Sequence, residues 1–172
     1  MNKKLFAIIL LFSVANFQCK KENKNEIDVS AITQTDALGN QTGNPDNTDW
    51  TKDNTWTNAE MNLFEAPTLS QLANTGTVTI SVFPAYPNPV SSVFMLYFNT
   101  SGATLLEMVI TDKSLTVKDR HFYMTHADVN FLATKLDETQ YDNNTNYRIY
   151  YAFYSLAGGQ YFKGHGDIKV TR

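Results

Sequence analysis

The chain has 172 residues, a length typical of one domain with a tail, and its 42% hydrophobic content is enough for a packed core. Its formal net charge is -3, and the absence of clustered lysine and arginine excludes a nucleic-acid binder. A single cysteine excludes an intramolecular disulfide and a cysteine-based metal cluster.

The N-terminal segment has the organisation of a secretory signal peptide. Lys3 and Lys4 make the start of the chain basic, and an apolar run from Leu5 to Ala15 follows, which is shorter than the ~20 residues that a bilayer-spanning helix needs. Two cleavage sites are compatible with it, one after Ala15 and one before Cys19. We favour the second site, which makes residues 1–18 the signal peptide.

The single cysteine lies where a lipoprotein cysteine lies. Cys19 follows the apolar run directly and is followed by the charged stretch "KKENKNE". This context resembles the N-termini of Bacteroidota-type lipoproteins. The resemblance implies an exported chain anchored to the cell envelope, at the outer membrane, by fatty acids such as palmitate on Cys19. More than one lipid chain gives stable anchoring. The alternative is a free thiol in a tail.

The next segment is predicted to be a flexible linker over residues 19–49, before a domain at 50–172. It is rich in Asp, Asn, Thr, Gly and Gln, so it offers little apolar surface to offset the entropy of ordering. The alternative is a calcium site at Asp46, Asp49 and Asp53. The spacing does not match the calcium-binding loop of an EF-hand, and we predict no metal and no cofactor.

A short helical turn is predicted over residues 58–64. Thr57 and Glu60 have the spacing of a capping box, in which each side chain binds the other residue's backbone N–H. Large apolar residues, including Trp50 and Trp56, surround this turn. We expect them to close one end of the domain; the alternative is an exposed aromatic platform for a ligand.

From residue 77 onward the sequence predicts strands. Residues 77–83 alternate in polarity, as in a half-buried strand, whereas 93–98 are apolar throughout and fit a strand covered on both faces. Residues 128–136 fit either a helix or a strand, and we assign a strand from the neighbours. The predicted strands are 77–83, 93–98, 104–112, 115–123, 128–136, 147–155 and 160–170.

Glycines mark special backbone positions near the C-terminus. Residues 157–159, Ala-Gly-Gly, predict a hairpin turn between the last two strands. Gly164 and Gly166 lie inside the last strand and indicate either a bulge or a close approach of another segment.

Seven short strands with no long helix predict an all-β fold, an antiparallel sandwich of immunoglobulin or fibronectin III type, with a short helical turn before it and a disordered N-terminal tail. Thr145 and Tyr147 lead the sixth strand after a polar loop. This resembles the tyrosine corner of fibronectin III domains. The resemblance implies a hydrogen bond between the Tyr147 hydroxyl and backbone upstream.

Three prolines separate the first two strands. Pro84, Pro87 and Pro89 donate no backbone hydrogen bond and favour extended neighbours, which predicts a stiff connector where the chain changes sheets. "AYPNPVSSVFMLYF" and the later "GQYFK" also resemble the type IX secretion C-terminal sorting domain, over residues 84–172. That resemblance implies an alternative function, a secreted protein whose C-terminal part is a sorting signal.

Candidate catalytic residues are few. His121 and His126 are five positions apart, so on a strand they point to opposite faces and do not share a metal. His165 and Asp167 share a face, and the carboxylate there could orient the imidazole. No nucleophile elbow, zinc-protease motif or phosphate loop accompanies them, and we predict that the chain is not an enzyme.

These observations favour a cell-envelope lipoprotein that presents a non-catalytic binding or adhesion module. Its expected contacts are the membrane, through the N-terminal lipid, and a protein or glycan ligand, with no nucleic acid. Tyrosines of the 147–155 strand that point outward are candidates for this contact, because their rings are both apolar and polar.

Overall fold

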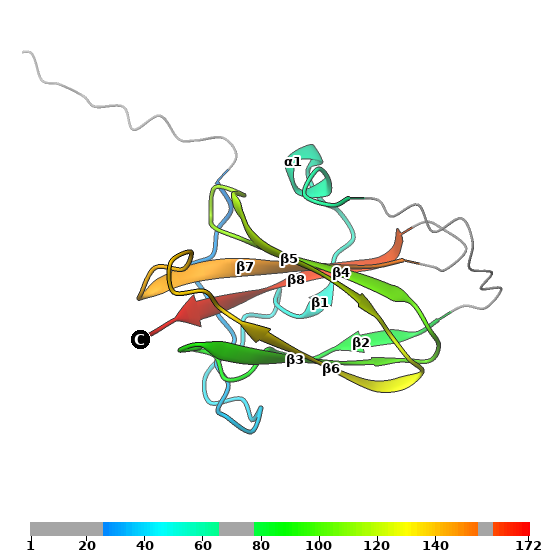
Figure 1. Ribbon diagram of the computed structural model, residues 1–172, viewed down its shortest axis with the longest axis horizontal. Coiled ribbons are helices and arrows are strands. Elements are labelled where there is room, and N and C mark those ends of the chain that lie inside the picture. Colours follow the sequence, from blue (N-terminus) through cyan, green and yellow to red (C-terminus); the bar gives the residue numbers. More distant parts are fainter. Residues whose placement is uncertain (1–25, 66–77, 155–159) are drawn as a thin grey trace, which may run out of the picture.

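The computed structural model describes residues 26–65, 78–154 and 160–172 (Figure 1). The predicted signal peptide, Cys19 and the predicted hairpin turn at 157–159 lie outside these residues. Within them, no helix has the length and apolar character that crossing a membrane requires.

The fold is nearly all β, as predicted. Its elements are β1 (Thr51–Lys52), α1 (Asn58–Met61), β2 (Ile80–Val82), β3 (Val93–Thr100), β4 (Leu105–Thr111), β5 (Val117–Met124), β6 (Asp128–Lys135), β7 (Thr145–Tyr154) and β8 (Gln160–Val170). They form a five-stranded sheet in the order β1-β8-β7-β4-β5 and a three-stranded sheet in the order β2-β3-β6, with all pairs antiparallel. The ambiguous segment is a strand, because β6 pairs with β3 over its whole length.

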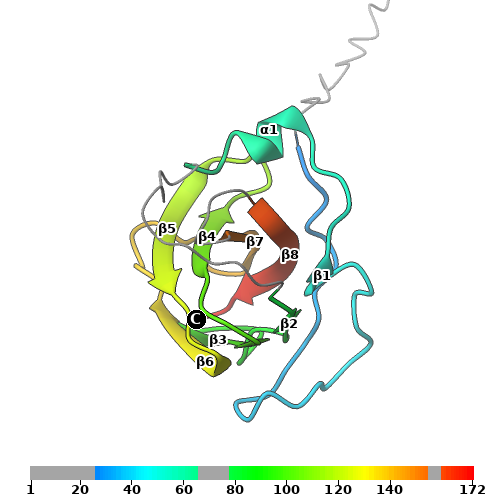
Figure 2. The ribbon, with the colours of Figure 1, turned by 90° about the vertical axis from the view of Figure 1, so that its right-hand side faces the viewer.

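The core lies between the two sheets, which face each other in Figure 2. Phe94, Leu96 and Phe98 of β3 are fully buried in it. The other sheet contributes Leu106, Met108, Ile110, Ile149, Tyr151, Phe153 and Ile168. The prediction that 93–98 is covered on both faces is wrong: the alternate residues of β3, among them Val93 and Tyr97, lie on the outer face and are not buried.

Residues 26–53, which we call the N-terminal strap, run along the sandwich (Figure 2). A flexible linker was expected up to residue 49, but from residue 26 the chain is hydrogen-bonded to the five-stranded sheet and to the proline segment. Thr33, Thr35 and Asp49 are buried although they are polar. The Thr35 hydroxyl donates to the Ala85 carbonyl at 2.7 Å, and Asp49 accepts from the Asp167 N–H of β8 at 3.0 Å. Thr35 also exchanges two backbone hydrogen bonds with Asn88 of the proline segment, of 2.8 and 3.1 Å. The strap is thus ordered by hydrogen bonds as well as by the burial of Trp50 in the core, and composition does not reveal these hydrogen bonds.

Contrary to the prediction, the proline segment does not carry the chain from one sheet to the other, because β2 and β3, which it joins, are paired in the three-stranded sheet. It reaches across to the five-stranded sheet and returns. Tyr86 exchanges backbone hydrogen bonds with Met95 of β3, and Val90 donates to Lys169 of β8. Between them Asn88 is fully buried, and its side chain donates to the carbonyls of Thr33 and Asp167 at 2.8 and 2.9 Å. Segments from both halves of the chain therefore meet at Asn88.

The capping box at the start of α1 is confirmed. The Glu60 side chain accepts from the Thr57 N–H at 2.7 Å, and the Thr57 hydroxyl accepts from the Glu60 N–H at 3.3 Å. The helix and its flanks do not close an end of the sandwich as expected. Trp56, Leu63 and Phe64 instead pack on β4 and β7, covering the outer face of the five-stranded sheet.

The two glycines of β8 allow a close approach, not a bulge. A Cβ on Gly164 would lie 2.0 Å from the Thr51 carbonyl oxygen, and one on Gly166 would lie 2.3 Å from the Trp50 ring. The shift in register between β7 and β8 lies elsewhere, at Phe153 and Tyr154. Without side chains, β8 can therefore receive Trp50 and β1 directly.

Candidate functional site

Three aromatic side chains form a row on the outer face of the three-stranded sheet. Tyr97 on β3 is paired with Phe131 on β6, and Phe83, just after β2, donates its backbone N–H to the Tyr97 carbonyl at 3.0 Å. The Phe83 and Tyr97 rings are stacked with centroids 4.5 Å apart, and those of Tyr97 and Phe131 with centroids 5.1 Å apart. We call these three residues the aromatic row.

The two outer members of the aromatic row are exposed to solvent, and Tyr97 between them is half-buried. Phe131 is 51% exposed and Phe83 38%, and the outward-facing Val93 and Val129 are 42% and 44% exposed. We call the aromatic row with these two valines the outer apolar face. On the other sheet, the segment around α1 covers the outer face of β4 and β7, whereas Phe122 and Met124 of the edge strand β5 stay exposed. A continuous exposed apolar surface is typical of an interaction site.

The ring geometry favours a protein ligand over a glycan. Both pairs of rings are within 20° of parallel, so the rings turn their faces to one another. A sugar packs against an open aromatic face, and such faces remain only at the two ends of the row. The row instead presents ring edges between apolar side chains, which suits contact with another apolar protein surface.

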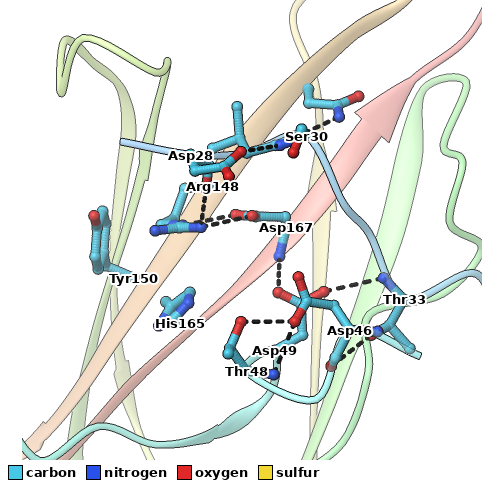
Figure 3. A network of polar contacts seen from close by, with 12 residues as sticks. Asp28, Ser30, Thr33, Asp46, Thr48, Asp49, Arg148, Tyr150, His165 and Asp167 are labelled. Carbon is cyan, nitrogen blue, oxygen red and sulfur yellow. Dashed lines mark hydrogen bonds and ion pairs between the residues drawn. The ribbon is translucent and has the colours of Figure 1, made fainter. Parts of the chain in front are cut away.

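A polar network joins the N-terminal strap to β7 and β8 (Figure 3). Arg148 donates to both carboxylate oxygens of Asp167 at 2.7 Å, and to the carbonyl of Asp28 at 2.6 Å. Asp49 accepts from the backbone N–H groups of Thr33 and Asp167, both at 3.0 Å. The network therefore fixes the strap on the sheet.

Two buried carboxylates in this network have raised pKa values. Burial, and then the negative charge of Asp167, raise the pKa of Asp49 to about 6, against the hydrogen bond from the Thr33 N–H. Burial also raises the pKa of Asp167, although Arg148 opposes this. The pKa of Arg148 is raised by the Asp167 carboxylate in spite of burial, so the guanidinium stays charged. The guanidinium and the two carboxylates are all bonded within the network, so we assign it the structural role of holding the strap on β7 and β8.

The three histidines lie in separate places. His165 does not pair with Asp167: its Nδ1 lies 2.7 Å from Asp53. The Nε2 of His121 lies 3.1 Å from Asp119, and the backbone N–H of His126 donates to Asn130. Among the residues that the structure describes, the hydrogen-bond and ion-pair partners of the three imidazoles include no serine, threonine or cysteine.

The carboxylates considered for calcium are bonded to protein donors. Asp46 accepts from the backbone N–H and the hydroxyl of Thr48, at 2.8 and 2.7 Å. Asp53 accepts from the Trp56 indole at 2.6 Å, and Asp49 is held as described above. Among the described residues, no three His, Cys, Asp or Glu side chains are grouped so that they could hold a metal.

An open groove of about 680 Å³ lies between the start of the strap, the β4–β5 turn and the loop before β7. Its charges are of both signs and partly paired: Lys113 lies 3.4 Å from Glu26, and Lys118 lies 3.4 Å from Asp112. Such a lining selects no particular ligand charge, and we do not assign the groove a function.

The tyrosines of β7 that were candidates for surface contact are not exposed, and other aromatic residues lie at the surface instead. Tyr147, Tyr150, Tyr151 and Tyr154 of β7 are all buried, because both faces of the five-stranded sheet are covered. Sequence reasoning missed the aromatic row. The alternation of β3 and β6 contains the signal that Tyr97 and Phe131 point away from the core, but only strand pairing shows that they are neighbours.

Comparisons with known proteins give no family for this chain. No protein-family model matches it, and neither the curated proteins nor the solved structures include a significant match.

Proposed function

We propose that the chain is an exported cell-envelope lipoprotein, anchored through Cys19, whose β-sandwich is a non-catalytic module that binds a protein partner through the outer apolar face. The observation that carries this proposal is the exposed aromatic row. A domain gains no stability from keeping Phe83 and Phe131 in water, whereas a partner that covers them gains their burial.

We infer that the domain is of the immunoglobulin or fibronectin III type. Leaving β1 aside, β2, β3 and β6 form one sheet, and β4, β5, β7 and β8 form the other. Counted from β2, the first sheet thus holds strands one, two and five, and the second holds strands three, four, six and seven. This strand order supports an immunoglobulin-like sandwich with its fourth strand on the sheet of the third, sixth and seventh. The contact of Tyr147 with backbone upstream of β7 also supports it.

The position of the strap is compatible with presentation from a membrane. Glu26, the first described residue, lies beside the β4–β5 turn, where Ile27 donates its N–H to the Lys113 carbonyl at 2.8 Å. The chain therefore joins the domain at the five-stranded sheet. An anchor attached there leaves the outer apolar face, on the other sheet, open to a partner.

The alternative, a sorting domain over residues 84–172, is weakened by the contacts of the strap. The backbone N–H and C=O of Asn88 are bonded to Thr35, its side chain also donates to Thr33, and Trp50 packs on Gly166. A segment that begins at residue 84 lacks these partners and leaves buried polar groups unpaired.

Two experiments test the proposal. Metabolic labelling with a palmitate analogue is expected to label the wild type but not Cys19→Ala; equal labelling of both, or none of either, rejects the anchor. A reporter fused to residues 84–172 in a host with a type IX system tests the alternative. Delivery to the surface that fails in a secretion mutant supports sorting and contradicts our choice.

The binding surface is tested by capture from envelope extracts of the producing cells. The full chain with Cys19→Ser is compared with the same chain carrying Tyr97→Ser and Phe131→Ser. A partner retained by the first and lost by the second is the expected result. Phe122→Ser, at a residue that is 48% exposed on β5, is the control and should retain it. A partner held equally by all three chains contradicts the assignment of the face.

A further inference from the structure

The four edge strands of the two sheets are not equally protected against pairing with another chain. β1 and β2 have two and three residues. β5 is longer, but Lys118, Asp119, Arg120 and His121 occupy its centre. β6 has eight residues, with charges only at its ends, Asp128 and Lys135. Short length and central charges are the usual protections of an edge, and β6 has neither.

The backbone of β6 is open on the side away from β3. Leu136, just past the strand, donates its N–H to the Ser92 carbonyl at 2.7 Å, and the ladder between β3 and β6 continues from there without a shift in register. Even-numbered residues of β6 therefore bond to β3, because bonded and non-bonded positions alternate in an antiparallel pair. The N–H and C=O groups of Val129, Phe131 and Ala133 point to the open edge. Within the described part of the chain, no hydrogen bond to these groups is found.

We propose that two copies of the chain associate by antiparallel pairing of β6 with β6, about a two-fold axis at Phe131. The three-stranded sheets of the two copies then form one six-stranded sheet. Each Phe131 exchanges two backbone hydrogen bonds with the Phe131 of the second copy, and each Val129 pairs with an Ala133. An interface of this kind is self-complementary, as a two-fold axis requires.

Side chains specify this register. The pairing places Phe131 beside Phe131 on the outer face, so the two aromatic rows join into one continuous row across both copies. Lys135 lies opposite Ala127 of the second copy, next to Asp128, so the charges at the two ends are of complementary sign. A shift by one residue would set outward side chains against inward ones, and a shift by two would separate the two phenylalanines.

The pairing goes beyond the proposed function, because it uses the backbone edge of β6 and needs no other protein. Sedimentation equilibrium of the full chain with Cys19→Ser is expected to give twice the mass of one chain. Phe131→Lys sets two like charges opposite each other and should raise the dimer Kd at least tenfold. Phe122→Lys places the same charge on β5, where the residue is 48% exposed, and should leave the dimer Kd unchanged.

Ala133→Pro separates the pairing from partner binding, since it removes only an edge N–H and leaves the aromatic row intact. It should also raise the dimer Kd at least tenfold, with an unchanged circular dichroism spectrum, while partner capture persists. A wild-type chain that sediments as a monomer, or variants at 131 and 133 that dimerise as tightly as the wild type, overturn the proposal.

Cysteine cross-linking tests the register in the Cys19→Ser background, which has no other thiol. Phe131→Cys places two thiols at the axis, and oxidation should link the two copies. Val129→Cys is the matched control, because the two copies of that position are offset by roughly 13 Å along the strands, at about 3.3 Å per residue. Linkage at 129 as efficient as at 131, or linkage at neither, contradicts the register.

Discussion

The hydroxyl oxygen of Tyr147 accepts a hydrogen bond of 2.7 Å from the backbone N–H of Asp142, five residues earlier in the chain. The contact implied by the sequence pattern before β7 is therefore confirmed. The Tyr147 ring meets that of Tyr141 edge to face, with centroids 4.9 Å apart. Both side chains are buried, but the Tyr141 hydroxyl has no hydrogen-bond partner among the described residues.

This pair of tyrosines predicts opposite responses to the same substitution. Tyr147→Phe removes the acceptor of the Asp142 N–H and should lower the free energy of unfolding by about 1 kcal/mol. Tyr141→Phe removes a hydroxyl that is buried without a partner and should be neutral or stabilising. Urea unfolding followed by fluorescence measures both. Equal losses for the two variants would show that the hydrogen bond does not matter.

Gly164→Ala should destabilise the domain, because its Cβ would lie 2.0 Å from the carbonyl oxygen of Thr51. Backbone cannot rotate away as a side chain can, so β1 must move, at a cost of roughly 1–3 kcal/mol or more. Gly43→Ala is the control, since its nearest contact would be at 3.6 Å. Thermal unfolding compares them, and similar melting temperatures for the two variants would contradict the close approach of β1.

Leu96→Ala and Ile149→Ala should each lower the free energy of unfolding by about 2–5 kcal/mol. Both side chains are fully buried, one in each sheet, so truncation leaves a cavity between the sheets. Val93→Ala, at an outer position that is 42% exposed, should cost about 0.5 kcal/mol or less. A domain in which all three variants unfold at the same urea concentration does not have the core described here.

The stability should rise as the pH falls from 7 toward 4. The pKa of Asp49 is about 6 in the folded chain and 3.8 is its ordinary value, so the folded state binds the proton first as the pH falls. Protonation of Asp49 therefore adds stability over this range, by roughly 3 kcal/mol at most. Below it the effect reverses, because Asp112 has a lowered pKa and loses its hydrogen bonds when protonated.

Asp49→Asn isolates this contribution. The variant has no carboxylate to protonate at that position, so the gain in stability between pH 7 and pH 4 should shrink. Unfolding free energies at several pH values, for wild type and variant, give the comparison. Parallel curves for the two chains would assign the pH dependence to other groups.

The sequence predicts the strands well and their neighbours poorly. Alternation along 77–83 and the Thr57–Glu60 pattern are local signals, and local hydrogen bonding and burial decide them. The contact of Thr35 with Asn88, like the stacking of Tyr97 on Phe131, joins segments far apart in the chain. Such contacts depend on register and sheet order, which no local pattern encodes.

The same limit explains why the strap was expected to be flexible. Its composition is polar, and a polar segment is ordered only where it finds partners for its backbone and side chains. Thr33 and Asp49 find theirs in Asn88 and Asp167, which follow much later in the sequence. The aromatic row was missed for a related reason: whether an outward face stays open depends on what folds over it.

The central claim is that the outer apolar face binds a protein partner in the cell envelope. A photo-crosslinking amino acid at Tyr97, in the middle of the aromatic row, tests it in the producing cells, with the same group at Phe122 as control. We predict that light produces a discrete adduct with another protein from position 97 and none from position 122, and that adduct formation fails when Phe83 and Phe131 are changed to serine. An envelope-localised chain that gives no adduct from position 97, or the same adduct from both positions, would contradict the account.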